Sequence, residues 1–320
     1  MAEKEKICYS GVGGQAVLEG VMMKNNEKYA IAVRKPDGEI DVKIDKFQGV
    51  LKENKLKKVP FIRGVFNFIE SLMLGMKSLN HSASFYEEEE ESKFDKAMDK
   101  LTKGKTEEVM TTVVTIFSVV LAIGIFIVLP YFLTSFLEKY IQSTYLMAVI
   151  EGVVRIAIFI LYVWGISFME DIKRLYMYHG AEHKCINCIE HGLELNVENA
   201  MKSSRLHKRC GTSFMFFVMF ISILLFFFIQ VDNRALRVLL RIALMPVVAG
   251  ISYEIIRLAG RSSNFIVQIL SAPGMMIQRM TTKEPDEDMI KVAIASVEAV
   301  FDWKQYQKEN FGDTAEEKEK

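Results

Sequence analysis

The sequence lacks the short motifs that identify the commonest soluble enzymes. It contains no G-x-S-x-G nucleophile elbow, no phosphate-binding loop ending in Gly-Lys-Ser/Thr and no G-x-G-x-x-G dinucleotide fingerprint. Its 40 Lys and Arg residues balance its 40 Asp and Glu residues, so a general nucleic-acid-binding protein is not expected. Residues Met1–Ser10 have no apolar core, so we expect no cleaved targeting segment.

Charge is also absent from long internal stretches, and this absence indicates an integral membrane protein. A hydrocarbon core about 30 Å thick is crossed by about 20 apolar residues in a helix. Four stretches fit this requirement, and we predict transmembrane helices over residues 109–137, 144–168, 213–231 and 236–258. The second contains Glu151 and Arg155, which can pair at i, i+4 on one helix face. The fourth carries Arg237 and Arg241 near one end and Glu254 and Arg257 near the other. Two hairpins that enter the membrane without crossing it are the alternative, and they would leave backbone groups exposed to lipid.

The basic residues predict the orientation of these helices. Seven Lys and Arg residues lie in the loop 169–212, whereas the link 138–143 contains one lysine. Because positive charge marks the cytoplasmic side, we expect a multi-pass protein of the cytoplasmic membrane, with both termini in the cytoplasm. In that reducing compartment the four cysteines are expected to be free thiols.

The remaining segments are expected to be cytoplasmic. Residues 1–86 predict an α+β segment with three parts: a glycine-rich stretch over 11–23 that packs closely against another element, a β-hairpin over 29–47, and an amphipathic helix over 61–79. That helix fits the membrane interface and a domain core equally well. Residues 87–108 indicate a charged, acidic linker, and residues 259–320 indicate a C-terminal amphipathic and cytoplasmic tail, broken at Pro273. The expected fold class is therefore mainly α and polytopic, with an N-terminal α+β segment.

The loop 169–212 contains the motif His179-Gly180-Ala181-Glu182-His183. Two histidines at i, i+4 lie on one helix face and can hold one metal ion, and H-x-x-E-H is the inverted form of a zinc-protease motif. In that motif the glutamate, here Glu182, is the catalytic general base. The alternative is two surface histidines with an acidic neighbour.

Other polar residues near the predicted cytoplasmic ends of the helices can complete this site. The further candidate metal ligands are His207, Cys210 and Glu254, and the glycine-rich segment adds Gln15 and Glu19. Glu254 could instead pair with Arg257 or Arg261 at a helix end. Cys185-x-x-Cys188 is a weaker candidate for a metal site, because it lacks a second ligand pair of its own.

Several blocks of the sequence resemble the YqhQ-like family of bacterial multi-span membrane proteins. They begin at Gly13 (GGQAVLEGVMM), Tyr178 (YHGAEHK), Arg205 (RLHKRCGTSF), Ala249 (AGISYE) and Gln278 (QRMTTKEP). The family is of unknown function and is described by inference as metal-dependent enzymes. The resemblance does not extend to Cys185 and Cys188, and therefore favours His179, His183 and His207.

Two functions from different classes follow. The first is a metal-dependent enzyme, expected to be hydrolytic, with a divalent metal ion (zinc first) as its cofactor at the cytoplasmic membrane face. The second is a non-catalytic membrane factor that binds protein partners during membrane-protein assembly or at the ribosome, through basic surface such as residues 52–58. A transporter is disfavoured, because Glu151 and Arg155 can neutralise each other. The bilayer is an expected partner in every case, and the substrate stays open.

The orientation can be tested with reporter fusions or cysteine labelling at Ser143, Asp232 and His191. We expect Ser143 and Asp232 to be accessible from outside the cytoplasm and His191 from the cytoplasm only, because the positive charge lies around His191. Labelling of His191 from outside, without labelling of Ser143, would show the orientation to be reversed.

Overall fold

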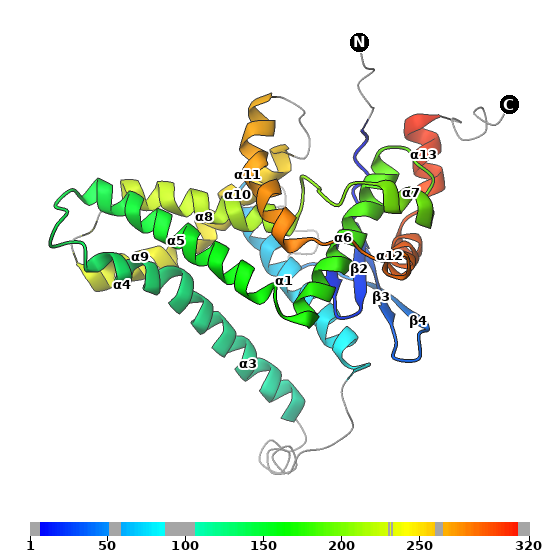
Figure 1. Cartoon of the computed structure of the whole chain (residues 1–320), viewed down its shortest axis with the longest axis horizontal. Coiled ribbons are helices and arrows are strands. Elements are labelled where there is room, and N and C mark those ends of the chain that lie inside the picture. Colours follow the sequence, from blue (N-terminus) through cyan, green and yellow to red (C-terminus); the bar gives the residue numbers. More distant parts are fainter. Residues whose placement is uncertain are drawn as a thin grey trace. The chain divides into compact units, whose positions relative to one another are not determined.

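The computed structural model (Figure 1) is mainly helical, with one antiparallel sheet near the N-terminus. The residues that it describes are 7–50, 59–86, 106–229, 231, 233–259 and 265–312. The basic segment 52–58, most of the expected linker 87–108 and the end of the C-terminal tail lie outside them.

The chain divides into two compact units. The first consists of Met1–Tyr86, Val163–Val218 and Pro246–Lys320, and the second of Glu87–Tyr162 and Met219–Met245. The sheet and the HGAEH motif both belong to the first unit.

The sheet has four antiparallel strands in sequence order. They are β1 (Gly13–Val17), β2 (Gly20–Asn25), β3 (Lys28–Arg34) and β4 (Ile40–Lys46). The pairing of β3 with β4 confirms the predicted hairpin. The strands β1 and β2 were not predicted, because glycine is depleted in strands and masks the alternation of apolar residues. The expected close packing of the glycine-rich stretch is present: a Cβ atom on Gly20 would lie 2.3 Å from the Ala32 carbonyl oxygen.

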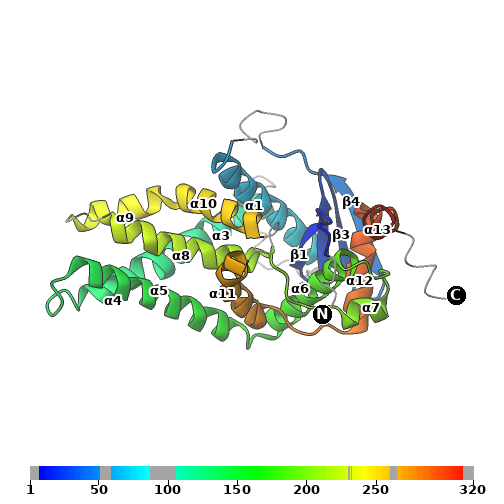
Figure 2. The same cartoon turned by 90° about the horizontal axis from the view of Figure 1, so that it is seen from above.

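Helices cover both faces of the sheet (Figures 1 and 2). On one face, helix α1 (Ile62–Ala83) packs through Leu74 against residues that alternate along the strands, among them Val17, Tyr29, Ile31 and Val33. On the other face, α6 (Glu170–Glu190) and α12 (Glu287–Val300) cover Val21, Met23, Ala30 and Ala32. This period of two is the pattern of a sheet that is buried on both sides. Helix α1 also carries exposed apolar residues, including Leu72 and Met76, and its position at a membrane interface stays a prediction.

Three further helices belong to the first unit. They are α7 (Val197–Lys202), α11 (Phe265–Thr281) and α13 (Trp303–Phe311). The predicted break at Pro273 is wrong, since α11 continues through this residue. A proline removes only one backbone hydrogen bond, and packing can compensate for that loss; the adjacent Gly274 lies so close to Ser213 that a Cβ atom there would be 2.9 Å from its Oγ.

Three helical segments of the described chain are long and apolar enough to cross a membrane. The first, Thr112–Ser135, runs through α3 (Thr106–Ile123), the π-helical turn η2 (Gly124–Val128) and α4 (Leu129–Ser135). The other two are α5 (Thr144–Ile166) and α8 (Gly211–Phe228). The fourth predicted span is a bent pair, α9 (Arg234–Ala243) and α10 (Met245–Ala259). Pro246 stands in the first turn of α10, where it needs no hydrogen-bond partner but ends the helix that precedes it.

The second residue of the HGAEH motif has a structural role that can be tested. A Cβ atom on Gly180 would lie 2.1 Å from the carbonyl oxygen of Lys283, because α6 packs against the segment that follows α11. We expect Gly180→Ala to reduce the free energy of unfolding by about 1–3 kcal/mol through overpacking. In the matched control, Gly165→Ala, the new methyl group enters open space on a helix and should be neutral or slightly stabilising. Equal shifts of the unfolding temperature in the two variants would contradict this packing.

Candidate metal centre

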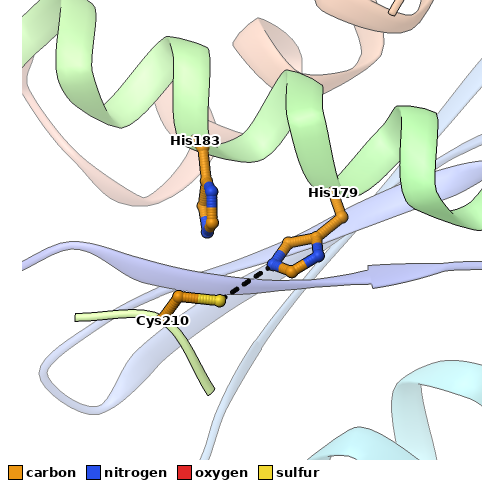
Figure 3. Close-up of side chains that lie close together, drawn as sticks. All are labelled: His179, His183 and Cys210. Atoms are coloured by element: carbon orange, nitrogen blue, oxygen red, sulfur yellow. Dashed lines mark hydrogen bonds between the residues drawn. The ribbon is translucent and has the colours of Figure 1, made fainter. Parts of the chain in front are cut away.

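Two imidazoles and one thiol converge on one point of the first unit (Figure 3). His179 and His183 project from the same face of α6 because they are one helical turn apart. Cys210 is the residue immediately before α8. The ligand atoms of the three residues all lie within 4.8 Å of one another, and His183 and Cys210 are buried. The i, i+4 histidines that the motif predicts are therefore joined by a third donor from a distant part of the sequence.

Main-chain carbonyl groups orient both imidazoles. His179 Nδ1 lies 2.9 Å from the carbonyl oxygen of Thr281, and His183 Nδ1 lies 2.7 Å from that of Arg205. A carbonyl oxygen only accepts hydrogen bonds, so each Nδ1 must carry the proton and donate it. In the neutral form of each ring this leaves the lone pair on Nε2. Hydrogen bonds of this kind are the usual means by which a protein fixes the tautomer of a metal-binding histidine.

The surroundings of Cys210 favour its thiolate form. Its Sγ lies 3.1 Å from His179 Nε2 and accepts a hydrogen bond of 3.3 Å from the backbone N–H of Thr212, in the first turn of α8. Burial opposes the thiolate, but His179 and His183 outweigh this effect and hold the pKa of Cys210 well below its usual value. Burial likewise disfavours charge on His179, and the Cys210 thiolate overcomes it and raises the pKa of His179 to about 9.

Glu182 is buried beside this group and is incompletely hydrogen-bonded. Its side chain reaches the sheet at Gly14, where a Cβ atom would be 3.1 Å from the carboxyl carbon, and the Gly14 N–H donates to it. Its Oε2 atom is buried and has no hydrogen-bond partner among the described residues. Burial raises the pKa of Glu182. A glycine in the glycine-rich segment thus makes room for the carboxylate of the motif.

His207 lies next to the group but outside it. Its ring centroid is 5.6 Å from that of His183, and burial lowers its pKa. Its Nε2 atom lies 3.1 Å from the Arg209 guanidinium group and 3.5 Å from Glu190 Oε2, and Arg209 also pairs with Glu190. Burial opposes charge on Glu190, but His207 and Arg209 lower its pKa to about 2. His207 is therefore part of a buried ion-pair network that borders the candidate ligands.

The structure does not bring the predicted acidic ligand Glu254 or the residues Glu19 and Gln15 into this group. Glu254 pairs with Arg63 of α1 through both carboxylate oxygens. Glu19, in the turn between β1 and β2, pairs with Arg174 and accepts a hydrogen bond from Tyr178. These contacts hold the sheet and α10 to neighbouring helices.

Gln15 points to the opposite face of β1 from Gly14. A Cβ atom on Gly75 of α1 would lie 2.5 Å from its side-chain oxygen, so Gln15 packs against that helix. The thiols of Cys185 and Cys188 are free and buried in the core formed by the sheet, α6 and α12. Neither belongs to the group of candidate ligands.

The sequence did not single out three residues that position the group. Gln278 accepts from the backbone N–H of His207 (3.0 Å) and donates to the His207 carbonyl and the Ser213 hydroxyl (2.7 Å each), which brackets Cys210. Thr281 and Arg205 supply the carbonyl groups that orient the histidines. Any residue type can supply a backbone carbonyl group, so the residue types at positions 205 and 281 do not reveal this role. The only sequence signal was that these residues lie in blocks that resemble the family, such as QRMTTKEP.

Comparison with known proteins finds relatives whose function is not characterised. The chain is 36% identical over 287 residues to the "Uncharacterized protein YqhQ" of Bacillus subtilis (strain 168), which covers 89% of this chain and 90% of that protein. No solved structure matches. The family model described as "Protein of unknown function (DUF1385)" matches residues 59–303, which include the HGAEH motif, Cys210 and Gln278. The chain belongs to this family.

Proposed function

We propose that this chain is a membrane metalloprotein that binds one divalent metal ion, zinc first, through His179, His183 and Cys210, and that it is a hydrolase. One observation carries the proposal: two imidazoles whose Nδ1 atoms face carbonyl groups present Nε2 beside the Cys210 sulfur, and the three ligand atoms lie within 4.8 Å of one another. Nitrogen and sulfur donors are the set that zinc prefers.

The number of donors favours catalysis over a purely structural metal. Structural zinc sites are closed by four protein ligands, whereas catalytic sites use three and leave one position open. Three donors are present among the described residues, and the acid beside them, Glu182, has an unpartnered buried oxygen. When bound, the metal ion would supply Lewis acidity.

The protein side chains would then divide the work. The Nε2 atoms of His179 and His183 and the Sγ of Cys210 would hold the ion. Glu182 Oε2, which lacks a partner, is available to take a proton from water, and the raised pKa of this carboxyl group suits a group that must both accept and release a proton. Arg205 and Thr281 would keep the imidazoles in their ligating tautomer.

We place this site at the cytoplasmic face of the membrane. The support for this position is the positive charge of the loop 169–212. Cys210 is also the last residue before a helix that is apolar and long enough to span the bilayer. The substrate class is left open.

A second candidate function rests on the same cysteine. The distance of 3.1 Å between Cys210 Sγ and His179 Nε2, together with the lowered pKa of the thiol, also fits a thiolate–imidazolium pair for covalent catalysis without metal. A thiolate–imidazolium pair needs only one imidazole, so it gives no role to the Arg205 carbonyl group that orients the His183 ring. We therefore rank the metal site first.

Metal content tests the proposal. Full-length protein purified in detergent without chelator should contain about one metal ion per chain, and His179→Ala, His183→Ala and Cys210→Ala should each remove it. Glu182→Gln should retain the metal, because this residue acts on water and does not ligate. Elemental analysis of each variant provides the measurement.

Cys188→Ala is the matched control for Cys210→Ala, since it removes a buried thiol outside the group. With cobalt as the probe metal, a thiolate-to-metal charge-transfer absorption should appear in the wild type and Cys188→Ala and be missing in Cys210→Ala. Folded wild-type protein without stoichiometric metal would contradict the proposal. Thiol catalysis and the partner-binding function would then take first place.

The affinity for zinc should depend on pH in a defined direction. Below a pKa of about 9 His179 holds a proton that the metal must displace. The pKa of Cys210 is held well below its usual value, so we expect the thiol to add no second proton to this exchange. The association constant should therefore rise about tenfold per pH unit from pH 7 and level off near that pKa. Competition titrations with a buffered zinc chelator measure this slope. An association constant that rises a hundredfold per pH unit would mean that the thiol is also protonated in the metal-free protein.

A further inference from the structure

The second unit contains a buried cluster of three charged side chains. Glu151 and Arg155 of α5 and Arg241 of α9 are 6%, 4% and 6% exposed. Arg241 donates to both oxygens of Glu151, at 2.6 and 2.8 Å. Arg155 donates to Glu151 Oε1 at 2.8 Å and to the hydroxyl of Ser222 on α8 at 2.9 Å. The predicted pair of Glu151 and Arg155 is thus present, but a second arginine joins it.

The cluster carries one positive charge in excess. Arginine remains protonated in proteins, so two guanidinium groups face one carboxylate. Within the described part of the unit, no second carboxylate lies within 4.0 Å of either guanidinium group. The ring of Phe226 lies 5.3 Å from the Arg155 Cζ and 5.1 Å from the Arg241 Cζ, which stabilises the charge without neutralising it. A buried charge without a counter-ion is costly, particularly in a helix that can span a membrane.

One donor of the cluster is unused, and it belongs to a residue that lines a cavity. The Nε–H of Arg155 is buried and has no partner in the described structure. A small, partly open cavity is lined by all three charged residues of the cluster, together with Gly152 and Ile223. Its volume of about 10 Å³ leaves room for one small species. An unused donor, an excess positive charge and a small cavity lined by the same residues together define a site for a small anion.

We propose that this cluster binds one small inorganic anion of the halide class, such as chloride, at the Nε of Arg155. The anion balances the second arginine and completes the polar contacts among α5, α8 and α9. A phosphate or carboxylate group of a larger molecule does not fit, because the cavity accommodates a single small ion. This site lies within the second unit and does not depend on the metal centre.

Thermal unfolding of the full-length protein in chloride, bromide and gluconate at equal ionic strength tests the proposal. Chloride and bromide should raise the unfolding temperature in a saturable manner, and gluconate, which is too large, should not. Equilibrium dialysis with radioactive chloride should find about one bound ion per chain. Identical stability in all three salts together with no bound chloride would overturn the proposal and leave a self-contained Arg–Glu–Arg triad.

Two variants and a control locate the site. Ser222→Asp places a carboxylate beside Arg155 and should abolish the chloride dependence, while Glu151→Gln doubles the excess charge and should tighten chloride binding about tenfold. Arg237→Gln, on the same helix as Arg241, removes an arginine that faces Glu138 and should leave chloride binding unchanged. Chloride binding that survives Ser222→Asp, or that is lost in Arg237→Gln, would overturn the assignment to this cluster. Dialysis of the wild type decides the matter even if a variant does not fold.

Discussion

The structure of the first unit depends on burying helix α6 although many of its residues are polar. Every residue from Gly180 to Glu190 is buried. A buried polar group without a hydrogen bond is costly, so each of these side chains needs a partner. In the segment between α7 and α8, the carbonyl group of Ser203 accepts from Lys184 and that of Ser204 accepts from Asn187. Glu190 accepts from Ser10 and Arg209. The Oε2 atom of Glu182 is the exception, and it lies beside two imidazoles and a thiolate.

The unpartnered oxygen of Glu182 agrees with the interpretation of this group as a metal centre. The buried side chains of Lys184, Asn187 and Glu190 in α6 have hydrogen-bond partners. Glu182 is also buried, but its Oε2 atom accepts no hydrogen bond within the described structure, which is energetically unfavourable. The same segment that satisfies Asn187 and Lys184 also supplies the Arg205 carbonyl to His183 and delivers Cys210. The contacts that hold this segment against α6 therefore also position the candidate ligands. Gln278 of α11 completes it by holding both sides of Cys210.

Only local features of this arrangement could be predicted from the sequence. The pairing of β3 with β4, the apolar helices and the shared face of His179 and His183 follow from short-range patterns. Cys210 was one of several candidates, because nothing in the sequence shows that it lies nearer to the histidines than Glu254 does. Glu254 instead pairs with Arg63, 191 residues away, and the pairing of Arg241 with Glu151 spans 90 residues. Such long-range ion pairs and carbonyl partners depend on the tertiary fold and have no local pattern.

X-ray absorption at the zinc edge of the full-length protein tests the central claim most directly, because it counts the atoms bound to the metal. Two imidazole nitrogens at about 2.0–2.1 Å and one sulfur at about 2.3 Å, with one further light atom, are the predicted shell. Cys188→Ala should give the same shell, whereas Cys210→Ala should contain no stoichiometric zinc. A shell of four sulfur atoms, a shell without sulfur in the wild type, or no bound zinc would contradict a centre made by His179, His183 and Cys210.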